Sequence, residues 1–154
     1  MNKQSVNPII FDSYMAMIKN SVGTKMFRSF FAYVDGQRVD VMNDGDLSCA
    51  YYTSCILTIF NLLKHRHATV ASTKNDLIDS GWKEADEVLP GAVLVWEEKV
   101  TDDKSVHQHI GFYIGDNQAI SNGKTSRVPE IHHWTYDGQR KITSIYYHHK
   151  LKNG

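Results

Sequence analysis

The sequence predicts a single α+β domain over residues 1–154, with helices in the first half and an antiparallel sheet in the second. Three observations support this fold class. Apolar residues recur at helical spacing in the first half of the chain. After Gly91, short β-type segments follow one another with turn residues between them. The length of 154 residues suits one domain with a buried core, and helices followed by strands are typical of α+β folds.

Four elements are expected in the first half: a helix over residues 8–21, a strand pair over 26–42, a strongly apolar helix over 48–65 and a short helix over 73–81. In the strand pair, Asp35 and Gly36 form a typical two-residue hairpin turn between two apolar runs. A helix that continues through Phe31 is the alternative for the beginning of that segment. The apolar character of the 48–65 helix predicts a central, well-covered position. Residues 82–90 are expected to be a connector.

Four strands are expected in the second half, over residues 92–98, 107–115, 118–122 and 141–149. A polar loop over residues 98–106 joins the first two, and a Gly-Asp-Asn turn joins the next two. Short connections between successive strands favour antiparallel pairing. The predicted architecture is therefore a helical layer packed on an antiparallel sheet of about five or six strands.

Charge and hydropathy exclude several classes of function. Lys plus Arg and Asp plus Glu number 17 each, so attraction to nucleic acid or to an anionic membrane by bulk charge is not expected. No run approaches the roughly 20 apolar residues of a membrane span. The N-terminal segment lacks the continuous apolar core and the small-residue cleavage site of a signal peptide, so we expect a cytoplasmic protein, with secretion by a non-standard route as the alternative.

The chain has two cysteines, Cys49 and Cys55, which form neither a disulfide framework nor a closed zinc site by themselves. Cys49 lies at the start of the apolar helix. Free backbone N–H groups and the positive end of the helix dipole favour a thiolate there, and the same N–H groups could hold an oxyanion. The alternative is a buried structural cysteine, because free cysteine behaves as a small hydrophobic residue. Cys55 is expected to be structural.

His109 begins the strand motif His-Ile-Gly-Phe-Tyr-Ile-Gly. Strand alternation places His109, Gly111 and Tyr113 on one face, opposite the more apolar face. Gly111 leaves room beside the imidazole for a helix end or a substrate. The alternative is a solvated surface histidine.

The remaining histidines do not form a familiar metal-binding pattern. They are His65, His67, His107, His132, His133, His148 and His149. No acidic or thiol ligand lies at a familiar spacing from them, and the His-Glu-x-x-His motif is absent, so no metal site is predicted. Whether His132 or His133 reaches a substrate groove is left open.

Several segments occur in an order typical of the NlpC-type papain-like cysteine peptidases. Residues 46–49, Asp-Leu-Ser-Cys, place a cysteine at a helix start after an acidic turn, and a short helix ending in Gly-Trp follows. Residues 89–96, Leu-Pro-Gly-Ala-Val-Leu-Val-Trp, are similar to the Pro-Gly-Asp segment that leads into a strand in this family. Residues 109–121 are similar to its histidine strand, turn and next strand. The match covers roughly residues 44–125, and the chain resembles a divergent member with a papain-like fold.

The resemblance implies that Cys49 is the nucleophile and His109 the base. His109 would take the thiol proton, or the two would rest as an ion pair. The third catalytic position of the family falls at Ser121, beside Asn122. We favour Asn122 for this role, because its side-chain oxygen can accept from the imidazole N–H, and we keep Ser121 as the alternative.

The family also uses an oxyanion donor upstream of the cysteine, often a tyrosine hydroxyl. Tyr33 and Ser48 are the candidates here. Two positions depart from the family pattern. Its Asp-Cys-Ser run is Ser48-Cys49-Ala50 in this chain, and its aspartate after Pro-Gly is Ala92.

The resemblance implies a cysteine hydrolase that cleaves an amide bond without a cofactor, with peptidoglycan-type peptides as the substrate class. Its partner would be a peptide or another small amide-containing substrate. One alternative is a catalytically inactive papain-like module that binds a peptide or a glycan in its groove. Another is an acyltransferase or thioesterase on the same scaffold.

Overall fold

The computed structural model describes residues 2–152 and confirms the α+β fold class. Within these residues a six-stranded sheet has the order β3-β8-β4-β5-β6-β7, and all its neighbouring strands are antiparallel. A separate two-stranded sheet pairs β1 with β2. The strands are β1 (Phe31–Val34), β2 (Gln37–Asp40), β3 (Trp82–Glu84), β4 (Val93–Val100), β5 (Val106–Gly115), β6 (Gln118–Asn122), β7 (Pro129–His133) and β8 (Ile142–His148).

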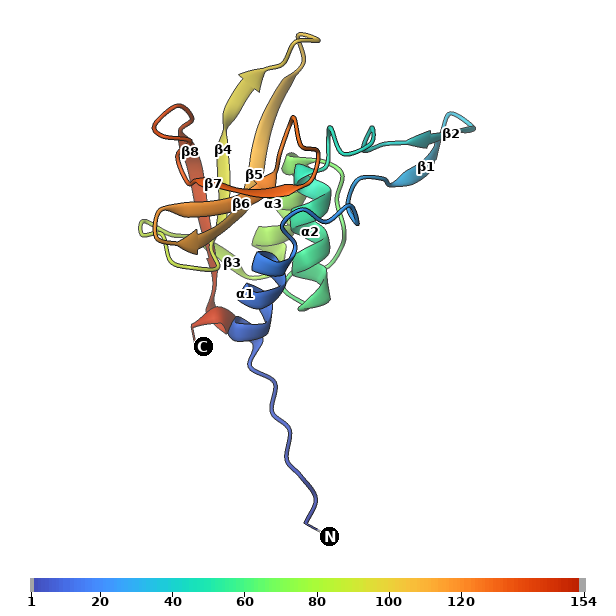
Figure 1. Ribbon diagram of the computed structural model, residues 1–154. Helices are drawn as coiled ribbons and strands as arrows, with labels where there is room; N and C mark the ends of the chain where they lie inside the picture. Colours follow the sequence, from blue (N-terminus) through green and yellow to red (C-terminus); the bar gives the residue numbers. More distant parts are fainter. Residues whose placement is uncertain (1, 153–154) are drawn as a thin grey trace.

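The helices cover one face of the large sheet (Figure 1). They are α1 (Ile10–Asn20), α2 (Cys49–Ile59), α3 (Val70–Asp79) and the short 3-10 helix η1 (His149–Leu151). Helix α2 packs on β5 and β6. The strand residues of the main core are buried and apolar, and they include Val93, Ile110, Phe112 and Ile120.

The opposite face of the sheet has a smaller core of its own. Its buried residues are Ala92, Leu94, Trp96, Tyr113 and Ala119. The loop between β7 and β8 packs against this core, and the Trp96 indole Nε1–H donates to the carbonyl oxygen of Trp134 at 2.7 Å. His109 pairs directly with Trp96 across β4 and β5, so it belongs to this second face.

The apolar helix is shorter than predicted, because it ends at Ile59 rather than at residue 65. Asn61 adopts a left-handed backbone conformation with φ 54°, which the helix cannot continue through. Leu62 and Leu63 are then buried in the main core as part of a turn. Because both are apolar and directly follow the apolar helix, the sequence pattern assigned them to that helix.

Helix α3 begins at Val70, before the predicted start at residue 73. Thr69 caps it, because the Thr69 side-chain oxygen accepts from the Ser72 N–H at 3.2 Å. Strands β3 and β7 lie in segments where no strand was predicted. β3 has three residues, too few to show alternation, and β7 begins with Pro129, a residue that is uncommon inside sheets.

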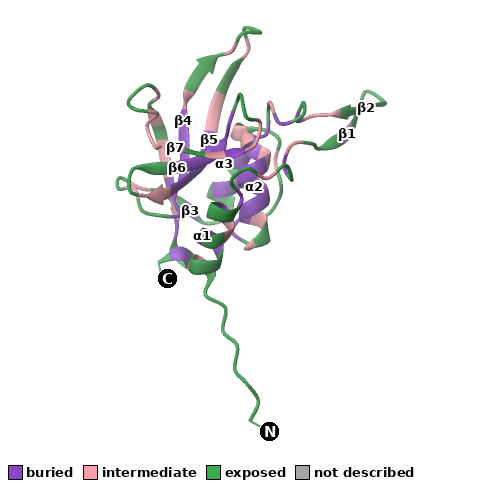
Figure 2. Ribbon diagram, viewed as in Figure 1, coloured by how far each residue is buried: buried purple, intermediate pink, exposed green. Residues whose placement is uncertain are grey.

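The hairpin of β1 and β2 confirms the predicted turn, and the alternative of a helix through Phe31 is wrong. Asp35 and Gly36 have φ values of 50° and 79°, as this type of tight turn requires. The hairpin projects from the body of the protein, and most of its residues are exposed (Figures 1 and 2).

None of the helices formed by residues 2–152 is long and apolar enough to cross a membrane.

Replacing Phe112 with alanine is expected to lower the free energy of unfolding by about 3–5 kcal/mol, because it opens a cavity in the main core. Phe112 is fully buried, and its ring lies 5.9 Å from the ring of Tyr14 and 5.6 Å from that of Tyr52. Phe31→Ala is the matched control, since this phenylalanine is 53% exposed on the hairpin. The control should cost about 1 kcal/mol or less. Urea unfolding measures both, and equal losses would contradict this description of the core.

Candidate active site

Cys49 is the first residue of α2, and the packing of that helix places it against strand β5. Its side chain is partly buried. The backbone N–H groups of Ile110 in β5 and of Ala50 in the helix lie against its sulfur. Ile110 directly follows His109 in β5. The Cys49 sulfur therefore contacts β5 at the residue next to His109.

Burial raises the pKa of the Cys49 thiol above its ordinary value. This effect outweighs the neighbouring N–H groups and the charge of Arg140, which act to lower the pKa. Burial also lowers the pKa of His109 to about 3, with smaller contributions from Arg140 and His132. Thiol and imidazole are therefore both neutral near pH 7. No hydrogen bond joins them within the described part of the chain.

Ser121 in β6 orients the His109 ring, since His109 Nε2 lies 2.8 Å from Ser121 Oγ. Ser121 pairs with Gly111 across β5 and β6, on the sheet face that carries His109. A Cβ at Gly111 would lie 2.6 Å from the Cβ of Ser121, so a side chain there would displace the serine. The room that Gly111 was expected to leave for a helix end or a substrate is filled by Ser121.

A chain of hydrogen bonds continues from Ser121 into β7. Ser121 Oγ lies 2.7 Å from His132 Nε2, and His132 Nδ1 lies 2.8 Å from the carbonyl oxygen of His133. A carbonyl oxygen only accepts, so His132 Nδ1 carries the proton of this bond. Burial lowers the pKa of His132, so its ring is neutral near pH 7 and its Nε2 is an acceptor.

These constraints fix the direction of each bond in the chain. Ser121 has one O–H proton, which it donates to His132 Nε2, so its oxygen accepts the N–H of His109 Nε2. His109 is therefore the tautomer that carries its proton on Nε2, and its Nδ1 keeps a free lone pair. That nitrogen is therefore free to accept a proton.

Aromatic side chains hold the two histidine rings in place. Tyr136 stacks on His132 with ring centroids 4.0 Å apart, and its hydroxyl lies 3.2 Å from Ser121 Oγ. The ring of Trp96 lies 5.4 Å from that of His109 and 5.5 Å from that of His132. The chain of hydrogen bonds is thus enclosed by packed rings on the second face of the sheet.

The sequence did not identify Tyr136 or Arg140 as site residues, and it left His132 open. These residues lie in β7 and the loop after it, where no element was predicted. The position of His132 near Ser121 can be inferred only when the pairing of β7 with β6 is known. His132 is directly opposite Ala119 in the β6–β7 pair, and two residues along β6 from Ala119 is Ser121, on the same face.

Asn122, favoured from the sequence as the residue that orients His109, does not occupy that position. Alternation along β6 turns Asn122 away from the face on which Ser121 meets the imidazole. Its buried side-chain nitrogen donates to the carbonyl oxygen of Gly45 at 2.7 Å. Asn122 therefore anchors the turn that leads into Cys49, and the alternative residue, Ser121, contacts the ring.

The two hydroxyl groups considered as oxyanion donors lie in very different surroundings. Ser48 occupies the N-cap position of α2, but it is fully buried, and its Oγ has no hydrogen-bond partner among the described residues. Tyr33 lies on the projecting hairpin and is 79% exposed. Backbone N–H groups at the start of α2 remain as donors, because the first N–H groups of a helix have no partner within it.

Histidines outside this cluster serve separate structural contacts. His67 Nε2 lies 2.7 Å from Asp76 Oδ2, and His148 Nε2 lies 2.9 Å from the carbonyl oxygen of Ser80. Among residues 2–152, no group of three or more His, Cys, Asp or Glu side chains is arranged to hold a metal ion.

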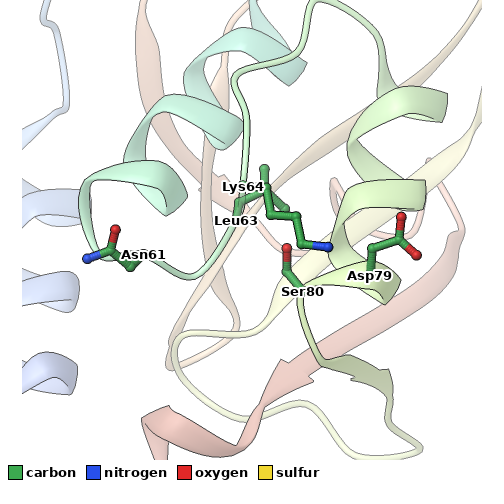
Figure 3. A pocket seen from close by; sticks show the side chains of 5 residues that line it. All are labelled: Asn61, Leu63, Lys64, Asp79 and Ser80. Atoms are coloured by element: carbon green, nitrogen blue, oxygen red, sulfur yellow. The ribbon is translucent and has the colours of Figure 1, made fainter.

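A cavity of about 450 Å³ lies at the other end of α2 from Cys49 (Figure 3). Its lining residues are Asn61, Leu63, Lys64, Asp79 and Ser80. The Ser80 hydroxyl already donates to Asp76 Oδ1 at 2.8 Å, so it is not an activated nucleophile. The described lining of this cavity therefore offers no activated hydroxyl nucleophile.

Comparisons with known proteins support the fold. No protein-family model and no curated protein matches the sequence. The solved structure of NlpC2 from Trichomonas vaginalis is similar to this chain, with a TM-score of 0.52 and 15% sequence identity. The match covers 94% of this chain and 50% of that chain, so this chain spans about half its length. The likeness shows an NlpC-like papain fold, as the sequence predicted, and at this identity it shows the fold alone.

Replacing His109 with glutamine is expected to reduce the loss of stability in acid. The pKa of His109 is about 3 in the folded protein and near its ordinary 6.5 when unfolded, so the unfolded chain binds the proton more tightly. The stability that the neutral ring provides is complete above pH 6.5 and is lost as the pH falls towards 3. This residue alone should lower the free energy of unfolding by up to about 1.4 kcal/mol per pH unit below pH 6.

Urea unfolding at pH 7, 6 and 5 measures the effect in the parent and in His109→Gln. His107→Gln is the matched control, because His107 lies two residues away in the same strand with an exposed side chain. The control should keep the pH dependence of the parent. An equally steep dependence in His109→Gln would show that the imidazole is not held neutral by burial.

Proposed function

We propose that this chain is a cysteine hydrolase that cleaves an amide bond, with Cys49 as the nucleophile and His109 as the base. One observation carries the proposal. The hydrogen-bond chain through Ser121 leaves His109 with a bare Nδ1, and the next residue of the strand, Ile110, contacts the Cys49 sulfur. A nucleophile at a helix start with an oriented base beside it is the arrangement that thiol hydrolases use.

The proposed reaction starts from the neutral pair. His109 Nδ1 takes the thiol proton as the Cys49 sulfur attacks the amide carbonyl carbon, and the carbonyl oxygen becomes an oxyanion. Backbone N–H groups at the start of α2 bind that oxygen. The C–N bond then breaks, His109 gives its proton to the leaving amine, and the acyl group stays on Cys49 as a thioester.

Water completes the cycle. His109 Nδ1 takes a proton from a water molecule as its oxygen adds to the thioester carbonyl. The C–S bond breaks, the acid leaves, and the proton returns to the Cys49 sulfur. Throughout, the bond from His109 Nε2 to Ser121 keeps the ring in one orientation, whether the ring is neutral or charged.

Peptidoglycan-type peptides are the proposed substrate class. The support is the resemblance of residues 44–125 to the NlpC-type peptidases, together with the NlpC-like fold. The departures at Ser48, Ala50 and Ala92 lie around the nucleophile and at the entry to β4, so the substrate can differ from that of other NlpC-type enzymes.

A catalytically inactive module that binds a peptide or a glycan is the second candidate. The raised pKa of the Cys49 thiol and the lack of a hydrogen bond from Cys49 to His109 within residues 2–152 favour it. An acyltransferase or thioesterase would form the same acyl-enzyme from other donors. We give priority to the hydrolase, because catalytic hydrogen bonds often form only when substrate is bound.

Incubation with peptides released from peptidoglycan, followed by acid quenching, is expected to leave an acyl adduct on Cys49 and to release an amine. Cys49→Ala should abolish both, and His109→Gln should slow amine release on the order of a hundredfold, the usual contribution of a general base. Intact-protein and peptide mass spectrometry locate the adduct, and Cys55 is the internal control.

Iodoacetamide at pH 7 tests the pair without a known substrate. Cys49 should be alkylated faster than Cys55, and His109→Gln should slow the Cys49 reaction by about tenfold while His107→Gln leaves it unchanged. An unreactive Cys49 in the parent, or equal rates in the parent and His109→Gln, would support the binding module instead.

A further inference from the structure

Arg140 places a positive charge beside His109. Its Nε and Nη2 donate to the carbonyl oxygen of Glu97 at 3.1 and 3.0 Å, and Nη2 also donates to the carbonyl oxygen of His107 at 3.2 Å. Glu97 follows Trp96, the residue that pairs directly with His109 across β4 and β5. Arg140 itself lies in the loop that leads into β8. The guanidinium is therefore fixed on β4 and on β5, the strand that carries His109.

The guanidinium is close enough to act on the reacting groups. His107 and His109 are two residues apart in β5, which is about 6.6 Å along a strand. The charge of Arg140 acts to lower the pKa of both the Cys49 thiol and the His109 ring, as a nearby cation must. Both effects agree with the place of the guanidinium beside His109, which its hydrogen bonds to Glu97 and His107 fix.

No direct ion pair compensates the charge of Arg140 among residues 2–152, although the Glu97 carboxylate lies near enough to act to raise its pKa. The guanidinium is partly buried, yet it forms no ion pair with any carboxylate of residues 2–152. The Glu97 carboxylate instead accepts the backbone N–H of Lys141 at 2.9 Å. The Nη1 group of Arg140 has no hydrogen-bond partner in the described chain. A partly buried cation is costly without an anionic partner, and a guanidinium is well shaped to bind a carboxylate.

A cavity of about 640 Å³ is lined by Arg140 and by the first residues of β8, and it lies beside Cys49 and His109, which do not belong to its lining. Trp134, Thr135 and Lys141 line it near the arginine. Its acidic residues, Glu84 and Asp86, lie at the other end, because the N–H between them, that of Ala85, binds the carbonyl oxygen of Ile145. Both cations of the lining are therefore at the end that adjoins the catalytic strands.

We propose that Arg140 selects substrates that carry a carboxylate close to the bond that is cleaved, with the carboxylate held at the Arg140 end of this cavity. The inference rests on the proposed function, since it names the substrate class of the same site. It differs from a general preference for peptides, because a neutral peptide would leave the guanidinium without an anionic partner.

The reaction of Cys49 with two small electrophiles of different charge tests this inference. Iodoacetate carries a carboxylate and iodoacetamide does not. In both reactions the sulfur forms a bond to the CH2 carbon as the carbon–iodine bond breaks and iodide leaves. We expect the ratio of the iodoacetate rate to the iodoacetamide rate to exceed that of free N-acetylcysteine by about tenfold, as for electrostatic focusing in a cleft of one sign. Arg140→Gln should bring the ratio back to the value of N-acetylcysteine.

Arg140→Lys keeps the charge and should retain most of the preference. Lys64→Gln removes an exposed cation beyond the end of α2 opposite Cys49, outside the proposed site, and should change the ratio little. If Arg140→Gln does not fold, the salt dependence of the parent replaces it. The ratio should fall between 0.05 and 0.5 M sodium chloride, because salt screens the charge. Rates are measured by peptide mass spectrometry, with circular dichroism as the check on folding.

The outcomes separate the two proposals. A Cys49 that reacts with neither reagent overturns the hydrolase and the role of Arg140 together. A reactive Cys49 whose ratio equals that of N-acetylcysteine, or whose ratio is the same in the parent and R140Q, overturns the anion preference alone. A raised ratio that R140Q abolishes and R140K retains supports it.

Discussion

The hydrogen bond of 2.8 Å between His109 Nε2 and Ser121 Oγ determines what this site can do. It exists because Gly111 leaves space for the serine on the shared face of β5 and β6. Ser121 in turn gives its only proton to His132, so the imidazole must donate and cannot accept at Nε2. The position of the proton on the His109 ring is therefore set by side chains of β5, β6 and β7. Helix α2 carries the Cys49 sulfur, whereas hydrogen bonds within the sheet fix the tautomer of His109.

Two opposing effects act on the thiol, and burial prevails. A helix start and nearby N–H groups stabilise a thiolate, and the charge of Arg140 acts in the same direction. Desolvation nevertheless leaves the pKa of Cys49 raised, while it lowers that of His109. The structure thus favours a neutral resting pair over the ion pair that the sequence also allowed. Proton transfer would accompany attack on the substrate, and an anionic substrate bound at Arg140 would reduce the influence of that charge.

Local patterns were sufficient to predict the fold class, the hairpin turn and the start of a helix near Cys49. The catalytic pairing of Cys49 with His109 came from the family resemblance and stays a prediction. Local patterns were insufficient where a contact depends on tertiary position. As an isolated side chain, Asn122 is the better group to accept a hydrogen bond from the imidazole. In the folded sheet, however, side chains alternate along β6, and Ser121 rather than Asn122 faces His109. Only the pairing of Ser121 with Gly111 reveals this. The position of His132 could not be predicted, because the sequence of β7 does not resemble a strand. It begins with proline and contains two histidines. Arg140 lies in a loop. A loop has no regular alternation of side chains from which the direction of the Arg140 side chain could be predicted.

Nitrogen-15 NMR of the histidine rings tests the protonation of His109 most directly. Two-bond proton–nitrogen spectra distinguish a protonated Nε2 from a protonated Nδ1 and from the imidazolium. The structure requires a neutral His109 ring with its proton on Nε2 at pH 7, unchanged down to about pH 5 because its pKa is about 3. Ser121→Ala should remove this fixed tautomer. A His109 ring that carries its proton on Nδ1, or that becomes an imidazolium between about pH 6 and 7, would contradict the assignment of His109 as the base for Cys49.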